Sequence, residues 1–396
     1  MTASNELFGF LSQESKTRSL NWYNIYGKEE AIGLHESNQA IHGGKVWWLS
    51  RKYGIPVSSI MDFSANINDF LPEIDISRIA AADNIHNYPD TEQEEYIGRL
   101  SEYAGVSKES IFLGPGLTYF IYRVAEKYRG SKVLLLEPTF SEYRRAFFVN
   151  GCTIQAASSD KIEEQLDTIS RGEFSIVMAT RPDNPVGNAM DRNRLNALAD
   201  ACRKGSAILF VDEAFIDFMG HEEVLESGKM IYQYGNLILG RSLTKILSIP
   251  SLRLGYIISA PGFIQELKDH LEPWTVSQIS LAFLSGVDFS VLDEVALAIE
   301  EERNYLIGQL DKLGLKVVGT PTANFATFKL PEGVKPNELE LFCFSRKILI
   351  RKLGDHAEFG DNYVRIAVKR RELSQKLIEA ISEFLSANKQ VSNSGE

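Results

Sequence analysis

The chain has 396 residues, a length that predicts a large domain plus a smaller one. Its composition, 44% hydrophobic and 24% charged, is ordinary for a soluble globular protein. The formal net charge of −11 argues against a nucleic-acid-binding protein, because phosphate backbones require clustered Lys and Arg; small anionic substrates need only a locally positive pocket.

The cysteines and the absence of long apolar runs predict the cellular compartment of the protein. Cys152, Cys202 and Cys343 are too widely spaced for a disulfide framework or a metal site, so we expect a reducing cytoplasm and no metal. The N-terminus does not resemble a secretory signal, and no stretch approaches the roughly 18 apolar residues of a membrane helix. We therefore expect a cytoplasmic protein without membrane contacts.

The predicted elements divide the chain into five parts. These are an N-terminal extension (1–34), a segment packing with the small domain (35–70), a large domain (71–285), a small C-terminal α+β domain (286–388) and a polar tail (389–396). Within the large domain, nearly continuous hydrophobic runs predict strands at 132–138, 174–180, 207–213, 236–242 and 254–260. Such runs are typical of strands buried on both faces of a mostly parallel sheet. Helical patterns between them, such as 191–205 with its terminal Gly, predict an α/β fold with helices on both faces.

Polar residues follow three of these strands. Asn184, Asp212 and Lys245 each come where an apolar run ends, and ligands of open α/β sheets bind at the carboxyl ends of strands. Taken singly, each has an ordinary explanation: a turn at Asn184, a helix cap at Asp212, a surface charge at Lys245. Together with Arg253, their spacing resembles that of fold-type I enzymes that use pyridoxal 5′-phosphate (PLP).

That resemblance implies the aspartate-aminotransferase fold, with a mostly parallel seven-stranded sheet in the large domain and a smaller α+β domain. Lys245 would supply the amine that binds the cofactor aldehyde, and it is the candidate catalytic residue. A carboxylate at Asp212 would keep the pyridine nitrogen protonated, and the amide of Asn184 would bind the 3′ oxygen.

The remaining cofactor ligands are expected around the phosphate and the ring. The phosphate needs a cation, hydroxyls and backbone N–H groups at a helix start. Phe140 is placed to stack on the pyridine ring, although core packing explains it equally well. The expected ligands are Gly116, Leu117, Thr118, Phe140, Phe215, Ser242, Thr244 and Arg253, with Tyr88 reaching the phosphate of a neighbouring subunit in a homodimer.

Within the fold, the chain resembles the histidinol-phosphate aminotransferase branch, and most of all the L-threonine-O-3-phosphate decarboxylase family of cobalamin biosynthesis. The specific segments are IHGG (41–44), DFSANIN (62–68) and DEAFIDF (212–218). Phe215 stands where most aminotransferases have Tyr. The resemblance implies decarboxylation of L-threonine O-3-phosphate to 1-amino-2-propanol O-2-phosphate, or of L-serine O-phosphate to ethanolamine phosphate. A histidinol-phosphate aminotransferase is the alternative enzyme, and a non-catalytic binding protein is the alternative class.

By the same resemblance, a phosphorylated amino acid would be held by two arginines, Arg351 and Arg365. Sequence does not indicate which guanidinium binds carboxylate and which binds phosphate. The further expected substrate ligands are His42, Gly43, Ser64, Asn66 and Asn184. Two departures from the family pattern lie near the cofactor motifs: GPGLT (114–118) where GNGET is usual, and RPDNPVG (181–187) in place of a TPNNPTG-like turn.

Overall fold

The computed structural model describes residues 44–71, 86–354, 359 and 362–393, with side chains up to residue 388. The chain forms two compact units. The smaller unit comprises the described residues up to Asn66, together with 304–318 and those from Thr327 onward; the larger comprises 67–303 and 319–326. The boundaries expected for the large domain, after residues 70 and 285, stay a prediction.

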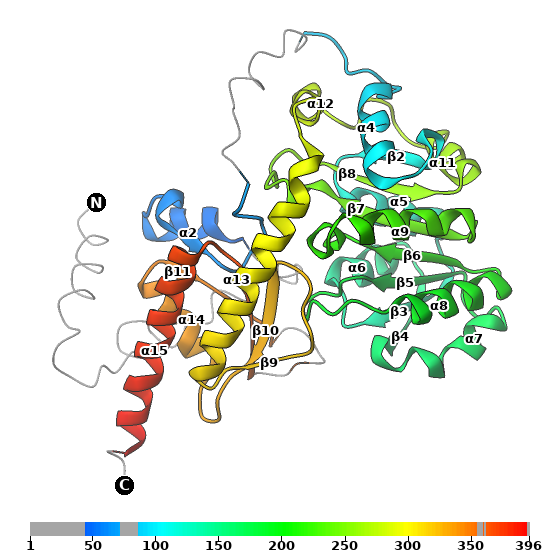
Figure 1. The fold of residues 1–396 in the computed structure, drawn as a ribbon. Coiled ribbons are helices and arrows are strands. Elements are labelled where there is room, and N and C mark those ends of the chain that lie inside the picture. The colour runs from blue at the N-terminus through cyan, green and yellow to red at the C-terminus, as the bar shows by residue number, and fades with distance from the viewer. Residues whose placement is uncertain (1–43, 72–85, 355–358, 360–361, 394–396) are drawn as a thin grey trace. The chain divides into compact units, whose positions relative to one another are not determined.

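A seven-stranded sheet forms the centre of the larger unit (Figure 1). Its strands are β2 (Ile111–Gly114), β3 (Lys132–Glu137), β4 (Thr153–Ser158), β5 (Ile176–Thr180), β6 (Ile208–Asp212), β7 (Leu237–Ser242) and β8 (Gly255–Ser259). They lie in the order β2-β8-β7-β6-β5-β3-β4, and β8 is antiparallel to both of its neighbours, whereas β3 to β7 are parallel. The predicted mostly parallel sheet is confirmed.

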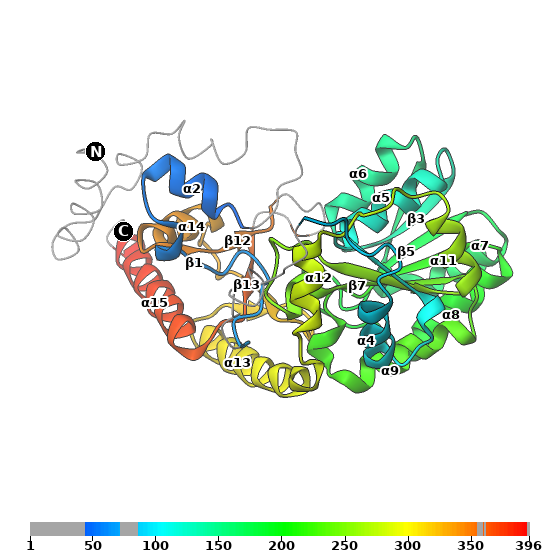
Figure 2. The same ribbon diagram turned by 90° about the horizontal axis from the view of Figure 1, so that it is seen from above.

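Helices cover both faces of this sheet (Figure 2). On one face, α5 (Leu117–Lys127), α6 (Ser141–Val149) and α11 (Pro261–Lys268) bury their apolar sides against alternate residues of the strands. On the other lie α4 (Glu94–Ala104), α8 (Arg192–Lys204) and α9 (His221–Lys229). The predicted helix at 191–205 is α8: the Asp191 carboxylate accepts from the backbone N–H of Arg194, and Gly205 follows its last residue.

Shorter segments complete the larger unit. These are α7 (Leu166–Ser170), α10 (Leu243–Ile246), α12 (Gln278–Ser285) and the short 3₁₀ helices η5 (Lys108–Ser110), η6 (Ser159–Glu164), η7 (Ile216–Met219), η8 (Met230–Tyr232) and η9 (Phe289–Val291). The long helix α13 (Leu292–Lys312) continues into the smaller unit. None of the described helices has both the length and the apolar character needed to cross a membrane.

The smaller unit is an α+β assembly. It contains a parallel pair, β1 (Met61–Asp62) with β11 (Ile348–Leu349), and a four-stranded sheet in the order β12 (Arg351–Lys352), β13 (Tyr363–Ala367), β10 (Phe325–Lys329), β9 (Lys316–Val317). Its helices are α2 (Val46–Tyr53), α14 (Pro336–Ser345) and α15 (Arg371–Asn393), with the turn η4 (Val57–Ser59).

Candidate active site

Three neighbouring parallel strands present the candidate cofactor residues at one edge of the large sheet. Asp212 ends β6, the loop carrying Asn184 follows β5, and Lys245 lies in α10 directly after β7. Because β5, β6 and β7 are adjacent and parallel, their carboxyl ends meet. Lys245 lies near enough to Asp212 to lower the pKa of its carboxyl. The structure therefore places the carboxylate and the amine close together, and the loop that carries the amide follows the neighbouring strand.

Asp212 is a buried carboxyl with an unusual environment. Burial raises its pKa to about 6, against the lowering effects of the Tyr143 hydroxyl, the Ala214 N–H and Lys245. The Tyr143 hydroxyl donates to Oδ2, and the Ala214 N–H donates to Oδ1 at 2.8 Å. Sequence analysis did not select Tyr143; the available signal was its place three residues after Phe140, on α6. A cation placed against this carboxylate would relieve the cost of burying the charge.

The start of α5 and the residues after β7 form a cradle suited to a phosphate. Gly116 has a φ of +87°, and a Cβ there would lie 2.8 Å from Nη2 of Arg253, so the guanidinium packs directly against this glycine. Within the described residues, no side chain caps α5, which leaves its start available to an anion. The hydroxyls of Ser242 and Thr244 lie 2.8 Å apart at the end of β7.

Leu117 explains one departure from the family pattern. Its side chain is buried in the core that covers the sheet, packed against Phe210 and Gly240. Only its backbone can therefore contribute to a phosphate site. Gly255 of β8 approaches the same helix start so closely that a Cβ would lie 2.7 Å from the Leu117 nitrogen.

Two phenylalanines lie near these groups. Phe140 is half-buried, with its ring edge-on to Tyr143 at a centroid distance of 5.8 Å. Phe215 is buried and packs edge-on against Phe325 at 5.0 Å. At the position where a tyrosine would present a hydroxyl, this chain thus has an apolar contact.

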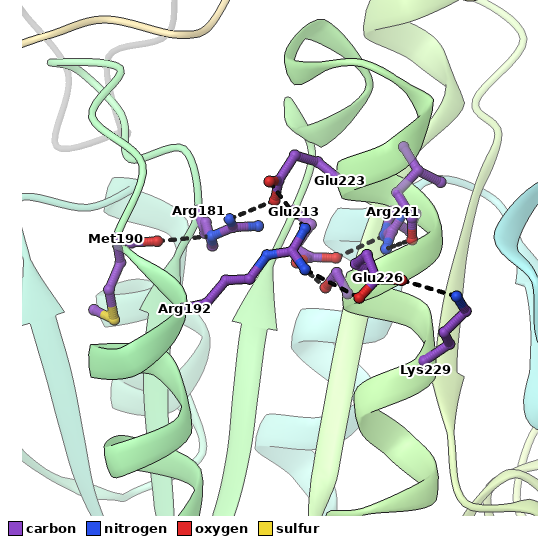
Figure 3. Close-up of polar contacts among 10 residues, drawn as sticks. Arg181, Met190, Arg192, Glu213, Glu223, Glu226, Lys229 and Arg241 are labelled. Atoms are coloured by element: carbon purple, nitrogen blue, oxygen red, sulfur yellow. Dashed lines mark hydrogen bonds and ion pairs between the residues drawn. The ribbon is translucent and has the colours of Figure 1, made fainter.

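A buried ion pair, which sequence analysis missed, lies behind the strand ends. Nε of Arg241 and Oε2 of Glu213 are 2.7 Å apart, and the side chains are 1% and 0% exposed (Figure 3). These residues adjoin Ser242 and Asp212 in sequence, and successive strand residues point to opposite faces, so the pair lies on the α9 side of the sheet. There Arg241 donates to the Val224 carbonyl at 3.2 Å.

The two predicted anion-binding arginines form a direct cross-strand pair in the smaller unit. Arg351 of β12 is the register partner of Arg365 of β13, so both side chains stand on one face of the sheet. Burial raises the pKa of the Glu340 carboxyl, and Arg351 lies near enough to this carboxyl for its guanidinium to oppose the rise. Arg365 is buried, and its Nη2 donates to the Ser64 carbonyl at 2.9 Å.

The DFSAN segment is held by its own first carboxylate. Asp62 Oδ1 accepts from the Ser64 hydroxyl at 2.6 Å, and the Gly44 N–H donates to the same hydroxyl at 3.0 Å. The side-chain oxygen of Asn66 is buried and has no hydrogen-bond donor in the part of the chain that the structure describes. His42 and Gly43 lie outside the described residues.

Tyr88 is an exposed aromatic residue of the larger unit. Its side chain is 79% exposed and stacks on Trp274, with ring centroids 4.6 Å apart. Its expected contact with the cofactor phosphate of a neighbouring subunit stays a prediction.

The residues present fit PLP chemically. A buried carboxylate suits a pyridinium nitrogen, an amine suits an aldehyde, and an arginine beside an uncapped helix start suits a phosphate. Such a cofactor would be held by Lys245, Asp212, Asn184 and Arg253.

Comparisons with known proteins agree with this chemistry. The model of the family described as "Aminotransferase class I and II" matches residues 58–381. The threonine-phosphate decarboxylase of Salmonella typhimurium is 28% identical over 372 residues, covering 87% of this chain and 96% of that protein. The histidinol-phosphate aminotransferase of Methanocella arvoryzae is 26% identical, covering 89% and 97%. The solved structure of a decarboxylase from Sulfurospirillum multivorans superposes with a TM-score of 0.77 at 21% identity, covering 91% of this chain and 97% of that one.

Proposed function

Because the chain belongs to the class I and II aminotransferase family, we propose that it decarboxylates L-threonine O-3-phosphate, L-serine O-phosphate or both. PLP is the cofactor, as expected from the sequence. The products would be CO₂ and 1-amino-2-propanol O-2-phosphate or ethanolamine phosphate, amino alcohol phosphates suited to the nucleotide loop of cobalamin. The observation that carries this choice is the similarity, over most of both chains, to a relative named threonine-phosphate decarboxylase.

The substrate's two anionic groups have matching partners in this proposal. Arg351 and Arg365 would bind its carboxylate and phosphate, because a guanidinium makes paired hydrogen bonds with either group. Their cross-strand placement supports this role, since it puts both guanidinium groups on one face of the sheet. Ser64 and the buried oxygen of Asn66 would add polar contacts.

The larger unit would supply the groups that act on the reacting atoms. When bound, PLP supplies a sink for the electron pair that stays on the substrate Cα as CO₂ leaves. Asp212 would hold a proton on the pyridine nitrogen, and the Asn184 amide would bind the ring 3′ oxygen. Lys245 would release the cofactor aldehyde to the substrate amine and then deliver a proton to Cα, in the place of the lost carboxylate.

Binding geometry would select decarboxylation over transamination. The residues that hold the substrate carboxylate would orient the bonds at Cα, and they would thereby decide between loss of CO₂ and loss of the Cα proton. Arg351 and Arg365 are the residues proposed for this task.

A direct assay tests the proposal. The purified protein is incubated with each phosphorylated amino acid without a keto acid, and CO₂ release is measured. Arg351→Met should lower kcat/KM by at least about 30-fold, because truncating one partner of a buried charge pair costs about 2–5 kcal/mol. Arg346→Met is the matched control: Arg346 pairs with Glu383 on the surface at 2.6 Å and should leave kcat/KM unchanged.

The alternative is a histidinol-phosphate aminotransferase, favoured by the relative from Methanocella arvoryzae. Amino transfer from histidinol phosphate to 2-oxoglutarate, with no CO₂ from either phosphorylated amino acid, would assign the protein to that activity. If CO₂ is released, the two rates show the preferred substrate; one methyl group is worth only about 1–3 kcal/mol of discrimination, so use of both is expected.

The proposal includes a homodimer. Tyr88 would reach the cofactor phosphate of the neighbouring copy, a role compatible with its 79% exposure and its stacking on Trp274. Sedimentation analysis of the cofactor-loaded protein would show the dimer.

A further inference from the structure

Arg181, the first residue of the unusual RPDNPVG turn, has a buried guanidinium that joins two parts of the larger unit. Its Nε donates to the Met190 carbonyl at 2.8 Å, and its Nη2 lies 2.7 Å from Oε2 of Glu223 (Figure 3). The side chain is only 4% exposed. The Arg181 guanidinium thus connects the two ends of the loop 181–190 and binds this loop to α9.

The segment enclosed by this contact is itself fixed by the second unusual residue, Asp183. Its carboxylate accepts from the N–H groups of Val186 at 3.1 Å and Gly187 at 2.7 Å, while its own N–H donates to the Asn188 carbonyl at 2.8 Å. Asn184 lies inside this turn. Its backbone is therefore held on both sides by contacts that begin at Arg181 and Asp183.

Helix α9 provides a fixed base for Arg181. The Val224 carbonyl accepts from Arg241 at the end of β7, and the Ser227 hydroxyl donates to Glu213 after β6. The same helix thus contacts the segments that carry Asp212 and Lys245. Through Glu223 it also holds the loop that carries Asn184.

The guanidinium group of Arg181 fixes the directions of both of its contacts. Burying a guanidinium costs free energy unless its donors are satisfied, so packing alone does not favour arginine here. Its rigid fork donates along two fixed directions, which a flexible ammonium or an apolar side chain cannot reproduce. A displacement of the loop relative to α9 would break one of the two contacts.

We propose that Arg181 is a positioning residue for Asn184: by linking the Met190 carbonyl to Glu223, it sets where the Asn184 amide stands against the cofactor ring oxygen. This rests on the role proposed above for Asn184. The RPDNPVG departure is then a substitute means of holding the amide, rather than a change in the groups that contact the substrate.

The test follows the cofactor in the absence of substrate, so it is independent of which reaction the enzyme performs. Two readouts are recorded: the dissociation constant of PLP from the apoprotein, and the pH midpoint at which the absorbance of the bound cofactor changes. Asn184→Ala gives the reference shift. Arg181→Met should shift the midpoint in the same direction and weaken PLP binding by about tenfold, the value of one hydrogen bond to a charged group.

The double variant decides between positioning and simple stabilisation. Arg181→Met combined with Asn184→Ala should show no further shift than Asn184→Ala alone, because both changes remove the same contact. If Arg181→Met fails to fold, Glu223→Gln replaces it, with the same expected shift. Arg192→Met is the control: Arg192 binds the same Glu223 at 2.9 Å but lies outside the loop and is 40% exposed.

Three results would overturn the inference: additive shifts in the double variant, an Arg181→Met protein that loses thermal stability without a change in either cofactor readout, or an Asn184→Ala protein with no shift. If the variants show the expected shifts but the wild-type protein releases no CO₂, the decarboxylase proposal is refuted and the positioning role of Arg181 is still supported.

Discussion

Asp212 makes the stability of the apoprotein depend on pH in a direction that can be measured. Burial raises its pKa from an ordinary value of 3.8 to about 6. The folded protein therefore binds this proton more tightly than the unfolded chain does. Between these two values the native state holds more protons, so the free energy of unfolding falls as pH rises.

The size of this effect follows from the same pKa values. A difference of about two pH units corresponds to about 3 kcal/mol, since one unit is worth 1.36 kcal/mol. Below pH 3.8 both states are protonated and the penalty is absent; above pH 6 both are ionised and the full penalty applies. Asp212→Asn removes the charge and with it this pH dependence.

The assay is urea unfolding of the apoprotein and of the Asp212→Asn apoprotein at several pH values between about 3 and 8. The difference in unfolding free energy should shift in favour of the variant by about 3 kcal/mol across this range. Asp183, whose pKa burial raises to about 7, is present in both proteins and cancels in the difference. Adding PLP should abolish the dependence, because a pyridinium beside the carboxylate offsets the buried charge.

A difference that stays constant with pH would refute this reasoning, since it would mean that Asp212 titrates alike in the folded and unfolded states. If the slope of unfolding free energy against urea concentration differs between the two proteins, their unfolding transitions differ. The two free energies are therefore compared only where these slopes are equal.

Two further outcomes are expected from contacts around the site. Arg241→Met should destabilise the protein by about 3–5 kcal/mol, because it leaves the Glu213 carboxylate buried without its cation. Adding Glu213→Gln should recover part of that loss. If the two changes in unfolding free energy, measured with urea, are strictly additive, the pairing is contradicted. Gly255→Ala places a Cβ 2.7 Å from the Leu117 nitrogen, so it should displace the start of α5. PLP binding, measured by equilibrium dialysis, should weaken by about tenfold. An unchanged dissociation constant would contradict a phosphate site at the start of α5.

The central strands could be predicted from sequence because they are buried on both faces. The predicted runs at 174–180 and 207–213 contain β5 and β6, and every residue of β5 is buried. The direction of β8 could not be predicted, because a strand buried on both faces has the same pattern whether it runs parallel or antiparallel. The edge strand β4, with the sequence TIQAAS, lacks a continuous apolar run and was not selected.

The candidate site was predictable where its residues follow strands, and not where its contacts come from elsewhere. Asp212, Asn184 and Lys245 are marked by strand ends. Tyr143 lies 69 residues from Asp212 and is one of several tyrosines, so its place three residues after Phe140 is the one local feature that marks it. Arg181 belongs to a departure that lies near the cofactor motifs in sequence, yet its side chain contacts α9, because consecutive residues at a strand end point to opposite faces.

The parallel pairing of β1 with β11 has a consequence for how the protein is made. Met61 and Asp62 pair with Ile348 and Leu349, so this small sheet joins two segments that are far apart in the sequence. A ribosome adding roughly 5–20 residues per second completes the larger unit before β11 exists. Strand β1 must therefore remain without its partner for roughly tens of seconds after its synthesis. Binding of a chaperone to the segment that carries β1 during this interval would be the sign of the delay.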